Sequence, residues 1–362
     1  MKHGTMRSAL YTLPLILLFP LLKPIFGQEQ PAPMPHDMGH MQHGGFMQGG
    51  MHHQTAKGVK LNVETDAAAH SVTLRIGPMN LPANTSHMKM PQPPDLIWTI
   101  DRSGWLLAYH PKLVDASGNT VAGVVLHHVA FWNENRSDFL CPNKDEHIFG
   151  AGGELTDWTL VPGFGYRVEK GDQIRIETMI HNPTPQAYEQ AYLKVAIPYV
   201  DDASPAPVKD FYPAWMDVRG CGNSGYDLLP GSSKKEGSVV VKYGGVLLGV
   251  GGHMHDYAQQ LVLEDSRAKE PVATLPAKTD DHGRLLSMPV VTFFQTGGYP
   301  FAPGDKLTIT ATYDNTSGKL LLDGAMGIVV GYFVPRDPGA LGALRHAAAA
   351  GEHHMAEMSH DH

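Results

Sequence analysis

Short apolar runs with alternating polar positions recur along most of this chain. A first series occupies residues 61–66, 71–77, 95–101, 104–111, 123–133, 164–182 and 191–200. A second series occupies residues 237–257, 259–265, 289–295, 306–315 and 324–335. Apolar and polar positions that alternate with a period of two, between Gly, Pro and Asn/Asp turns, are typical of half-buried strands. Apolar spacing at the helical period is sustained only in the alanine-rich residues 339–351.

The two series predict an all-β protein with two antiparallel β-sandwiches in tandem, of the jelly-roll-like kind. A chain of 362 residues is long enough for both. The loop at residues 200–213, rich in Asp, Pro and Ala, is the expected linker. We therefore expect an N-terminal sandwich at residues 58–204 and a C-terminal sandwich at residues 205–336.

The first 27 residues have the layout of an export signal. Lys2 and Arg7 precede an apolar run at residues 9–22, and polar residues follow Gly27. This order predicts a signal peptide at residues 1–27 and a periplasmic or secreted protein with no membrane contact after cleavage. An uncleaved anchor is the alternative, although the run is short for a bilayer.

Residues 28–57 and 337–362 are rich in Met and His and offer little to bury. Between Met34 and His53 there are five Met and five His, separated mainly by Gly, Gln and Pro. Such a composition predicts disorder. Flexible Met and His side chains suit the capture of copper ions; the alternative is a solvated tail without a function.

Composition and cysteine content bear on the fold class, on nucleic-acid binding and on a disulfide. The chain holds 39 Gly and 28 Pro, which favours a turn-rich β protein, and its formal charge is −8. Without a Lys/Arg cluster we expect no nucleic-acid partner. Cys141 and Cys221 are the only cysteines, and in an exported protein we expect them to form a disulfide. An intermolecular bridge or two separate thiols are the alternatives.

Two pairs of closely spaced histidines lie in the strand-like runs. His253 and His255 differ by two positions, so both project from one face of a regular strand. His127 and His128 are adjacent and converge on one ion only if their strand ends, bulges or twists there. Each pair alone is a weak signal, because histidines of a surface or a core also occur at such spacings.

A further metal-capable residue follows each pair, His181 after the first and Met326 after the second. A thioether selects Cu(I), and imidazole suits both oxidation states of copper. The pattern predicts two copper sites, one with His127, His128 and His181 and a softer one with His253, His255 and Met326. A structural zinc or iron site is the alternative; Met326 argues against zinc, which seldom uses a thioether.

The order of these residues resembles the copper type II, ascorbate-dependent monooxygenase family of peptidylglycine α-hydroxylating monooxygenase and dopamine β-monooxygenase. The resemblance extends over about residues 80 to 335. It includes a Pro/Gly-rich stretch at residues 160–168 before His181 and a segment with a Gly-Asp turn at residues 299–317 before Met326. The resemblance implies a bacterial-type exported member, with a His3 copper in one domain and a His2Met copper in the other, across a cleft.

By this resemblance His127, His128 and His181 hold an electron-transfer copper. The set His253, His255 and Met326 then holds the catalytic copper, where O2 binds and a C–H bond is hydroxylated. The implied cofactors are two copper ions per chain, with an ascorbate-like reductant as co-substrate. O2 and a small-molecule substrate are the implied partners, and copper-trafficking proteins are further candidates.

The chain departs from the family where peptide substrates are held. Gly251 replaces an arginine two residues before the second histidine pair, Val330 replaces a tyrosine, and Met179 replaces a glutamine. Because a buried carboxylate needs a charged partner, we do not expect glycine-extended peptides as substrates. The leading expectation is a dicopper monooxygenase for an unidentified small substrate. The alternative is a non-catalytic protein that sequesters or delivers copper.

Several other residues have weaker claims. His87 with Met88 and Met90 could form an accessory soft site, although a strand-edge position is the expected one. Asp256 is either an acceptor for a ligand imidazole or a turn residue. Tyr257 and Tyr313 are candidate neighbours of the second site. For the remaining histidines of the strands and turns we expect surface or capped positions: His110, His147 and His282.

Overall fold

The structure is a computed structural model that describes residues 54–154, 157–204 and 208–345. The signal peptide expected at residues 1–27, nearly all of the segment 28–57 and most of the tail 337–362 lie outside these residues. The all-β prediction is confirmed, because the helical elements of the described residues are short 3-10 turns. They are η1 (His87–Lys89), η2 (Gly123–Val125), η3 (Phe294–Thr296) and η4 (Gly342–Leu344). No described helix has the length and hydrophobicity to span a bilayer.

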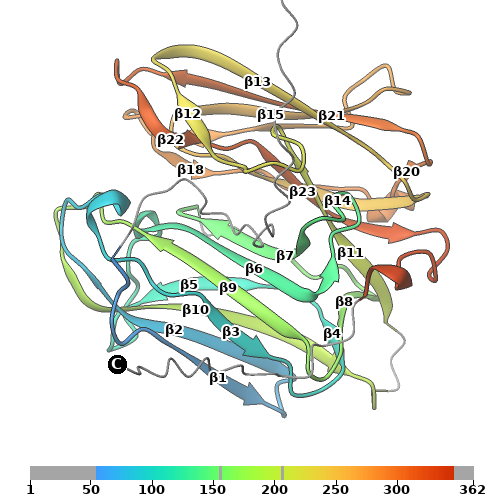
Figure 1. Ribbon diagram of the computed structural model, residues 1–362, viewed down its shortest axis with the longest axis horizontal. Coiled ribbons are helices and arrows are strands. Elements are labelled where there is room, and N and C mark those ends of the chain that lie inside the picture. The colour runs from blue at the N-terminus through green and yellow to red at the C-terminus, as the bar shows by residue number, and fades with distance from the viewer. Residues whose placement is uncertain (1–53, 155–156, 205–207, 346–362) are drawn as a thin grey trace, which may run out of the picture. The chain divides into compact units, whose positions relative to one another are not determined.

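One large sheet runs through both series of strands (Figure 1). Its main path is β1-β2-β10-β4-β8-β11-β23-β14-β19, while β5 pairs with β10 and β20 with β14. The strands of this sheet are β1 (Lys60–Asp66), β2 (Ser71–Leu81), β4 (Gly104–Leu106), β5 (His110–Val114), β8 (Phe164–Val168), β10 (Tyr188–Asp201), β11 (Lys209–Asp217), β14 (Gly245–His253), β19 (Val291–Thr292), β20 (Tyr299–Phe301) and β23 (Ile328–Pro335).

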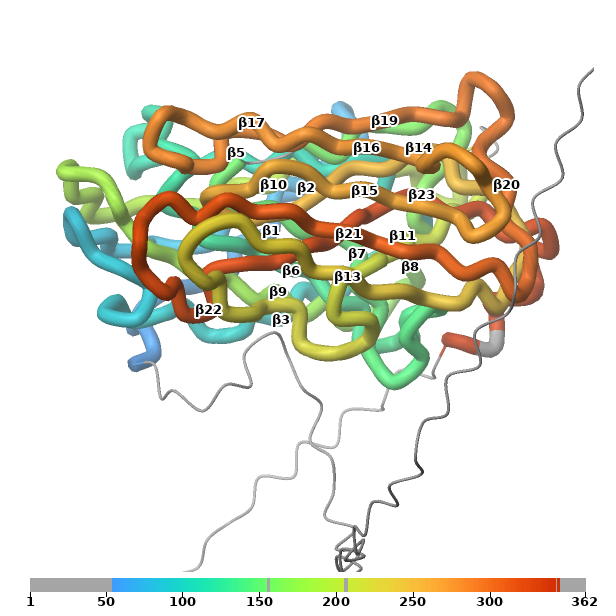
Figure 2. Tube along the Cα trace, turned by 90° about the horizontal axis from the view of Figure 1, so that it is seen from above, coloured from blue at the N-terminus to red at the C-terminus, as the bar shows by residue number. Residues whose placement is uncertain are grey.

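Two four-stranded sheets complete the sandwiches. The first has the order β3-β9-β6-β7, with β3 (Leu96–Thr99), β6 (Leu126–Ser137), β7 (Asp145–Gly152) and β9 (Gln173–Ile180). The second has the order β13-β21-β15-β16, side by side in Figure 2, with β13 (Gly231–Val240), β15 (Ala258–Asp265), β16 (Ala273–Pro276) and β21 (Lys306–Asn315). Two-stranded pairs join β12 (Tyr226–Leu228) to β22 (Leu321–Ala325) and β17 (Lys278–Thr279) to β18 (Leu285–Ser287).

Each four-stranded sheet covers a hydrophobic core. In the first core, buried side chains of β6 and β9 such as Phe131 and Ile176 pack with those of β2 and β10 such as Leu74 and Val195. In the second core, side chains of β15 and β21 pack with those of β14 and β23. Alternate residues of β2 are buried, as expected for a strand with one face on a core. Apolar residues therefore alternate in the sequence because one face of each such strand packs on one of these two cores.

Strand β11 links the two halves of the large sheet. It pairs parallel with β8 on one side and antiparallel with β23 on the other. The parallel pair is a departure from the purely antiparallel arrangement that the sequence predicts. Strands β9 and β10 lie between β8 and β11 in the chain, so no hairpin joins the two parallel partners. The boundary expected at residues 204 and 205 falls beside the undescribed residues 205–207, and the division into two domains remains a prediction.

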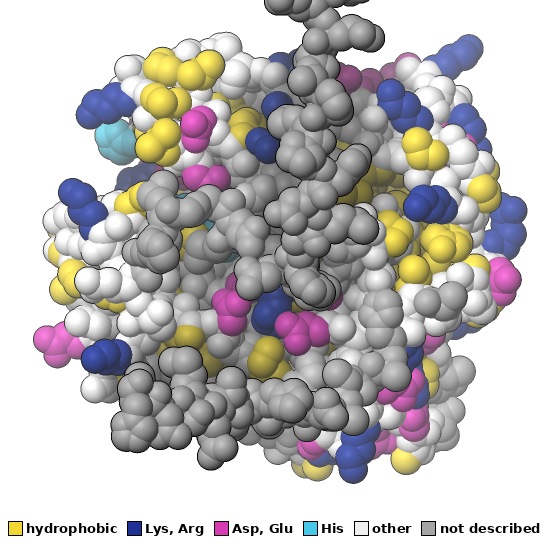
Figure 3. All heavy atoms as spheres, in the orientation of Figure 1, with side chains coloured by type: hydrophobic (Ala, Val, Ile, Leu, Met, Phe, Trp, Pro, Cys, Tyr) yellow, Lys and Arg dark blue, Asp and Glu magenta, His cyan; other side chains and the backbone are white. Residues whose placement is uncertain are grey.

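The disulfide expected between Cys141 and Cys221 is present, with Cα atoms 5.5 Å apart. It lies at the second core, where Phe139, Leu140 and Cys141 pack from the loop after β6. On the face shown in Figure 3, the described Lys and Arg side chains lie singly or in small groups among acidic and neutral ones.

Candidate metal centre

The start of β6 carries the first histidine pair. Pairing of β6 with β9 shifts register between Leu126 and His128, which leaves His127 as an extra residue at this point. Such a bulge turns adjacent side chains toward the same region. The ring centroids of His127 and His128 are accordingly 5.1 Å apart. The bulge is one of the three irregularities by which the sequence allowed these neighbours to converge.

His181 lies directly after the last residue of β9. Its backbone N–H donates a hydrogen bond to the carbonyl oxygen of Val125, the last residue of η2, at 3.1 Å. This bond fixes His181 beside the bulge. Its ring stacks on that of His127, with centroids 5.0 Å apart and planes 29° apart. The structure thus brings together the three histidines of the first predicted set.

The second pair lies at the end of β14. His253 is the last residue of this strand, and Met254 points into the second core, where it is 1% exposed. Side chains alternate along a strand, so His253 and His255 both project away from this core, as their spacing predicts. Their ring centroids are 5.5 Å apart.

The two predicted histidine sets are not separate in the structure. One ring nitrogen from each of His127, His128 and His255 lies within 4.8 Å of the other two. Nitrogens bound to one ion at about 2.0 Å can be at most about 4 Å apart, so small side-chain movements would close this group around an ion. How two ions would divide among the predicted ligands remains a prediction.

Met326 lies just before β23 and is 2% exposed. It belongs to a small apolar cluster with Ile328 and Val330, against Trp158 and Trp215. It lines the same pocket as His128 and His253. The predicted thioether ligand therefore lines the same pocket as two of the histidines, within an apolar cluster.

Tyr313 connects the backbones of two predicted ligands. Its hydroxyl accepts hydrogen bonds from the N–H of His255 at 3.0 Å and of Met326 at 3.2 Å, and it donates one to the carbonyl oxygen of Met326. The Tyr313 side chain is 1% exposed, so these bonds lie in the interior. The expectation that Tyr313 neighbours the second site is met by this contact, through backbone groups rather than through the ring.

Glu154 is a residue of this centre that the sequence did not single out. One of its carboxylate oxygens lies 3.0 Å from Nδ1 of His253 and accepts a hydrogen bond from the N–H of Gly152 at 3.1 Å. Burial alone would raise the pKa of Glu154, but the charge and hydrogen bonding of His253 lower it below its usual value. The carboxylate favours a proton on Nδ1 of His253 and directs Nε2 away from itself. The one sequence signal is an acidic residue directly after a Gly-Gly turn.

The environment keeps the histidines of this group neutral. Burial lowers the pKa of His127, His128, His181 and His255, and neighbouring imidazoles lower it further for His127, His128 and His255. A neutral imidazole has a lone pair that can bind a metal ion. The Nε2 atoms of His253 and His255 are buried without a hydrogen-bond partner. Buried nitrogen lone pairs without protein partners fit a metal ion with affinity for imidazole, such as copper.

The weaker candidates have mixed outcomes. The ring of His87 lies 4.7 Å from that of His127, while Met88 is 41% exposed and Met90 is buried in the first core, so these three side chains do not converge. Asp256 accepts a hydrogen bond from the N–H of Leu285 at 2.9 Å, which fits the turn alternative.

For His147 the surface position, one of the two expected alternatives, is wrong. It is 4% exposed, and its ring lies between those of Trp132 and Trp215. A single histidine in an apolar strand carries no signal of such stacking, because its neighbours come from other parts of the chain.

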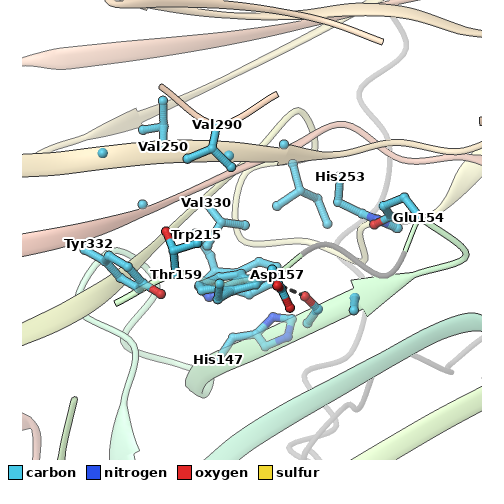
Figure 4. A pocket seen from close by; sticks show the side chains of 18 of the residues that line it. His147, Glu154, Asp157, Thr159, Trp215, Val250, His253, Val290, Val330 and Tyr332 are labelled. Carbon is cyan, nitrogen blue, oxygen red and sulfur yellow. Dashed lines mark hydrogen bonds and ion pairs between the residues drawn. The ribbon is translucent and has the colours of Figure 1, made fainter. Parts of the chain in front are cut away.

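An apolar pocket lies against the centre (Figure 4). His128, His253 and Met326 contribute to its lining from β6, β14 and the connection before β23. Figure 4 shows Val250, Val290 and Val330 on one side and the rings of Trp215 and His147 on the other. A largely apolar pocket beside a cluster of convergent polar groups is the common form of a small-molecule site.

In sequence, the chain is similar to proteins named probable copper-dependent oxygenases. It is 27% identical over 235 residues to the probable copper-dependent oxygenase M1 of Phoma sp., an alignment that covers 59% of this chain and 58% of that protein. It is 27% identical over 234 residues to the probable copper-dependent oxygenase clz3 of Cochliobolus lunatus, covering 59% and 72%. The chain thus spans little more than half the length of M1. No protein-family model matches the chain.

Proposed function

We propose that this protein is an exported dicopper monooxygenase that hydroxylates a C–H bond of a small molecule. O2 and an ascorbate-like one-electron donor would be its co-substrates, and copper-trafficking proteins would load it in the periplasm or outside the cell. The observation that carries the proposal is the gathering of the six predicted ligands beside an apolar pocket. Similarity to two probable copper-dependent oxygenases supports it.

Two ligand sets would hold the copper ions. His127, His128 and His181 would bind one ion, and His253, His255 and Met326 would bind the other. The thioether of Met326 would favour Cu(I) at the second site, and imidazoles suit an ion that changes oxidation state. Bound copper would supply one-electron transfer and the activation of O2. Gly251, Val330 and Met179 replace residues of the peptide-amidating enzymes, so glycine-extended peptides are not the proposed substrates.

Other residues of the chain would prepare the site. Glu154 would hold Nδ1–H of His253 so that Nε2 faces the metal, and Tyr313 would fix the backbones of His255 and Met326. The apolar pocket would exclude water from the reacting C–H bond, which limits side reactions. Tight positioning of ligands by buried partners raises metal affinity and fixes the geometry of the site.

The test is ascorbate-driven O2 consumption by the copper-loaded full chain, with Met326→Ile compared against Met79→Ile. Met79 is a buried methionine of β2 in the first core, so its variant controls for the loss of a buried thioether. We expect O2 consumption to be lost in Met326→Ile and retained in Met79→Ile.

Equal O2 consumption in the two variants, with copper still bound, would contradict catalysis at a copper held by Met326. A protein that holds copper without catalysis would then be the better account.

A further inference from the structure

We propose that the apolar pocket binds an uncharged, mainly hydrocarbon molecule with a flat ring, as the substrate that the centre hydroxylates. This inference rests on the proposed function, because it names the substrate class of that site.

The pocket is placed to bring a substrate to the predicted catalytic residues. His253 and Met326, from the second predicted ligand set, line it together with His128 from the first. A molecule that fills the pocket therefore contacts both sets. Hydroxylation of a C–H bond requires such direct approach to the reactive centre.

The described side chains that line the pocket offer little compensation to a charged guest. Among its described lining residues there is no Lys or Arg, and two are acidic. The Glu154 carboxylate is already hydrogen-bonded to the His253 ring and to the N–H of Gly152. Asp157 lies 3.3 Å from Nδ1 of His110 and is 59% exposed, so it sits at the solvent side. A guest carboxylate would lose its hydration without gaining a Lys or Arg, and a guest ammonium group would meet only Asp157, at the solvent side. Such a loss costs several kcal/mol as an order of magnitude.

Two departures from the peptide-amidating enzymes both lie in this lining. At Gly251 those enzymes have an arginine, and at Val330 a tyrosine; here both positions line the apolar pocket. A Cβ at Gly251 would meet only Cγ2 of Val290, at 3.6 Å. The missing side chain therefore leaves room, and the room is bordered by a methyl group rather than by a polar partner.

The floor of the pocket is a supported aromatic surface. Trp215 stacks on His147, with centroids 3.4 Å apart and planes 8° apart, and Trp158 lies 5.8 Å from Trp215 at 24°. Nε1 of Trp158 donates a hydrogen bond to the carbonyl oxygen of Gly150 at 3.0 Å, which fixes its ring. Fixed indole rings favour stacking of a flat ring at little entropic cost.

The experiment compares three probes that share one carbon skeleton and differ in charge. They are 4-phenyl-1-butanol, 4-phenylbutyrate and 4-phenylbutylammonium. Binding to the copper-loaded full chain is measured by calorimetry without O2, so that no turnover is needed. We expect the neutral alcohol to bind at least about tenfold more tightly than either ion, because only the ions lose hydration without compensation.

Two variants at one position separate charge from volume. Gly251→Arg should reverse the preference toward 4-phenylbutyrate, while Gly251→Leu should weaken all three probes by filling the space. Circular dichroism and the melting temperature establish that each variant is folded. If Gly251→Arg does not fold, the comparison of wild type with Gly251→Leu still tests occupancy of the pocket.

Measurements of binding and of turnover test the substrate class and the monooxygenase activity separately. Tight binding of the alcohol without ascorbate-dependent product in air would leave the substrate class intact and contradict the monooxygenase. Equal or tighter binding of 4-phenylbutyrate or 4-phenylbutylammonium to the wild type would overturn the substrate class. Binding of no probe, or probe affinities unchanged in a folded Gly251→Leu, would overturn it as well.

Discussion

The two histidine pairs reach the same place by different backbone means. At the start of β6, adjacent His127 and His128 converge through a shift in strand register. At the end of β14, His253 is the last strand residue and His255 lies two residues on, with Met254 between them in the core. The first pair depends on a register shift between β6 and β9, whereas the second depends on an alternation of side chains that continues for two residues past the end of β14. Ligand spacing alone is thus a better guide to the second pair than to the first.

The hydrogen bonds that hold the two histidine pairs in place also differ. Beside the first pair, a backbone bond from His181 to Val125 holds the chain. At the second pair, two side chains do this work, Glu154 on the His253 ring and the Tyr313 hydroxyl on the His255 backbone. Side-chain supports can be removed one at a time by mutation, so the second pair is the place to test how the centre is built.

The largest effect is expected from His255→Ala. His255 is the residue of the second pair whose ring nitrogen lies within 4.8 Å of those of His127 and His128. Copper affinity should fall at least about a hundredfold, since loss of even an outer partner of a ligand costs about 10- to 100-fold. Exposed His282 provides the control, His282→Ala.

The Cu(II) paramagnetic resonance spectrum sharpens the comparison of the pairs. If the histidines act as one group, His255→Ala changes the signals of both coppers. A variant that keeps one copper with an unaltered signal would instead mean that the two predicted sets are independent.

Tyr313→Phe should lower the free energy of unfolding by about 1–3 kcal/mol, because it leaves buried backbone groups of His255 and Met326 without their partner. Its neighbour Tyr226 provides a matched control, because the buried Tyr226 hydroxyl has no hydrogen-bond partner. Tyr226→Phe should be nearly neutral. Urea unfolding of both variants checks this, and equal losses would show that the Tyr313 hydroxyl does not support the second pair.

Gly152→Ala should disturb His253 without removing a ligand. A Cβ at this position would lie 2.6 Å from Oε2 of Glu154 and 2.7 Å from Cε1 of His253, so one of them must move. Copper affinity should fall about tenfold, as for loss of an outer partner. Gly342→Ala is the control, because a Cβ there meets no atom within 4 Å. Unchanged affinity in a folded Gly152→Ala would argue that the Glu154–His253 contact is dispensable.

The smallest effect on the metal centre is expected from a change at Asp138, which directly follows β6 at the end away from the histidines. Burial raises the pKa of Asp138 to about 6. A raised pKa means that ionisation opposes folding, so the stabilising contribution is full below about pH 4 and is lost as pH rises through about 6. Asp138→Asn should therefore gain stability relative to wild type between pH 5 and pH 7.5, by about 1–2 kcal/mol.

Urea unfolding at the two pH values measures this difference, and copper affinity should not change. A relative gain that shrinks as pH rises would contradict the sign, and an altered copper affinity would tie this end of β6 to the histidine pair.

The sequence was sufficient for the all-β class, because alternation of apolar residues reports directly on strands that face a core. The His253 and His255 spacing was readable for the same reason. The bulge at His127 was not, since a register shift depends on the partner strand β9. Glu154 lies 99 residues from His253, and the stack of His147 on Trp215 joins β7 to β11. Such pairings arise only when distant strands meet, so local patterns do not contain them.

The bridge between Cys141 and Cys221 spans 80 positions of the chain. A protease that cuts the backbone once anywhere within this span produces two fragments that stay covalently attached. In an oxidising compartment such a nick would leave the histidines of β6 and β14 in one molecule. Nicked protein should run as a single band on a denaturing gel without reductant and as two bands with it.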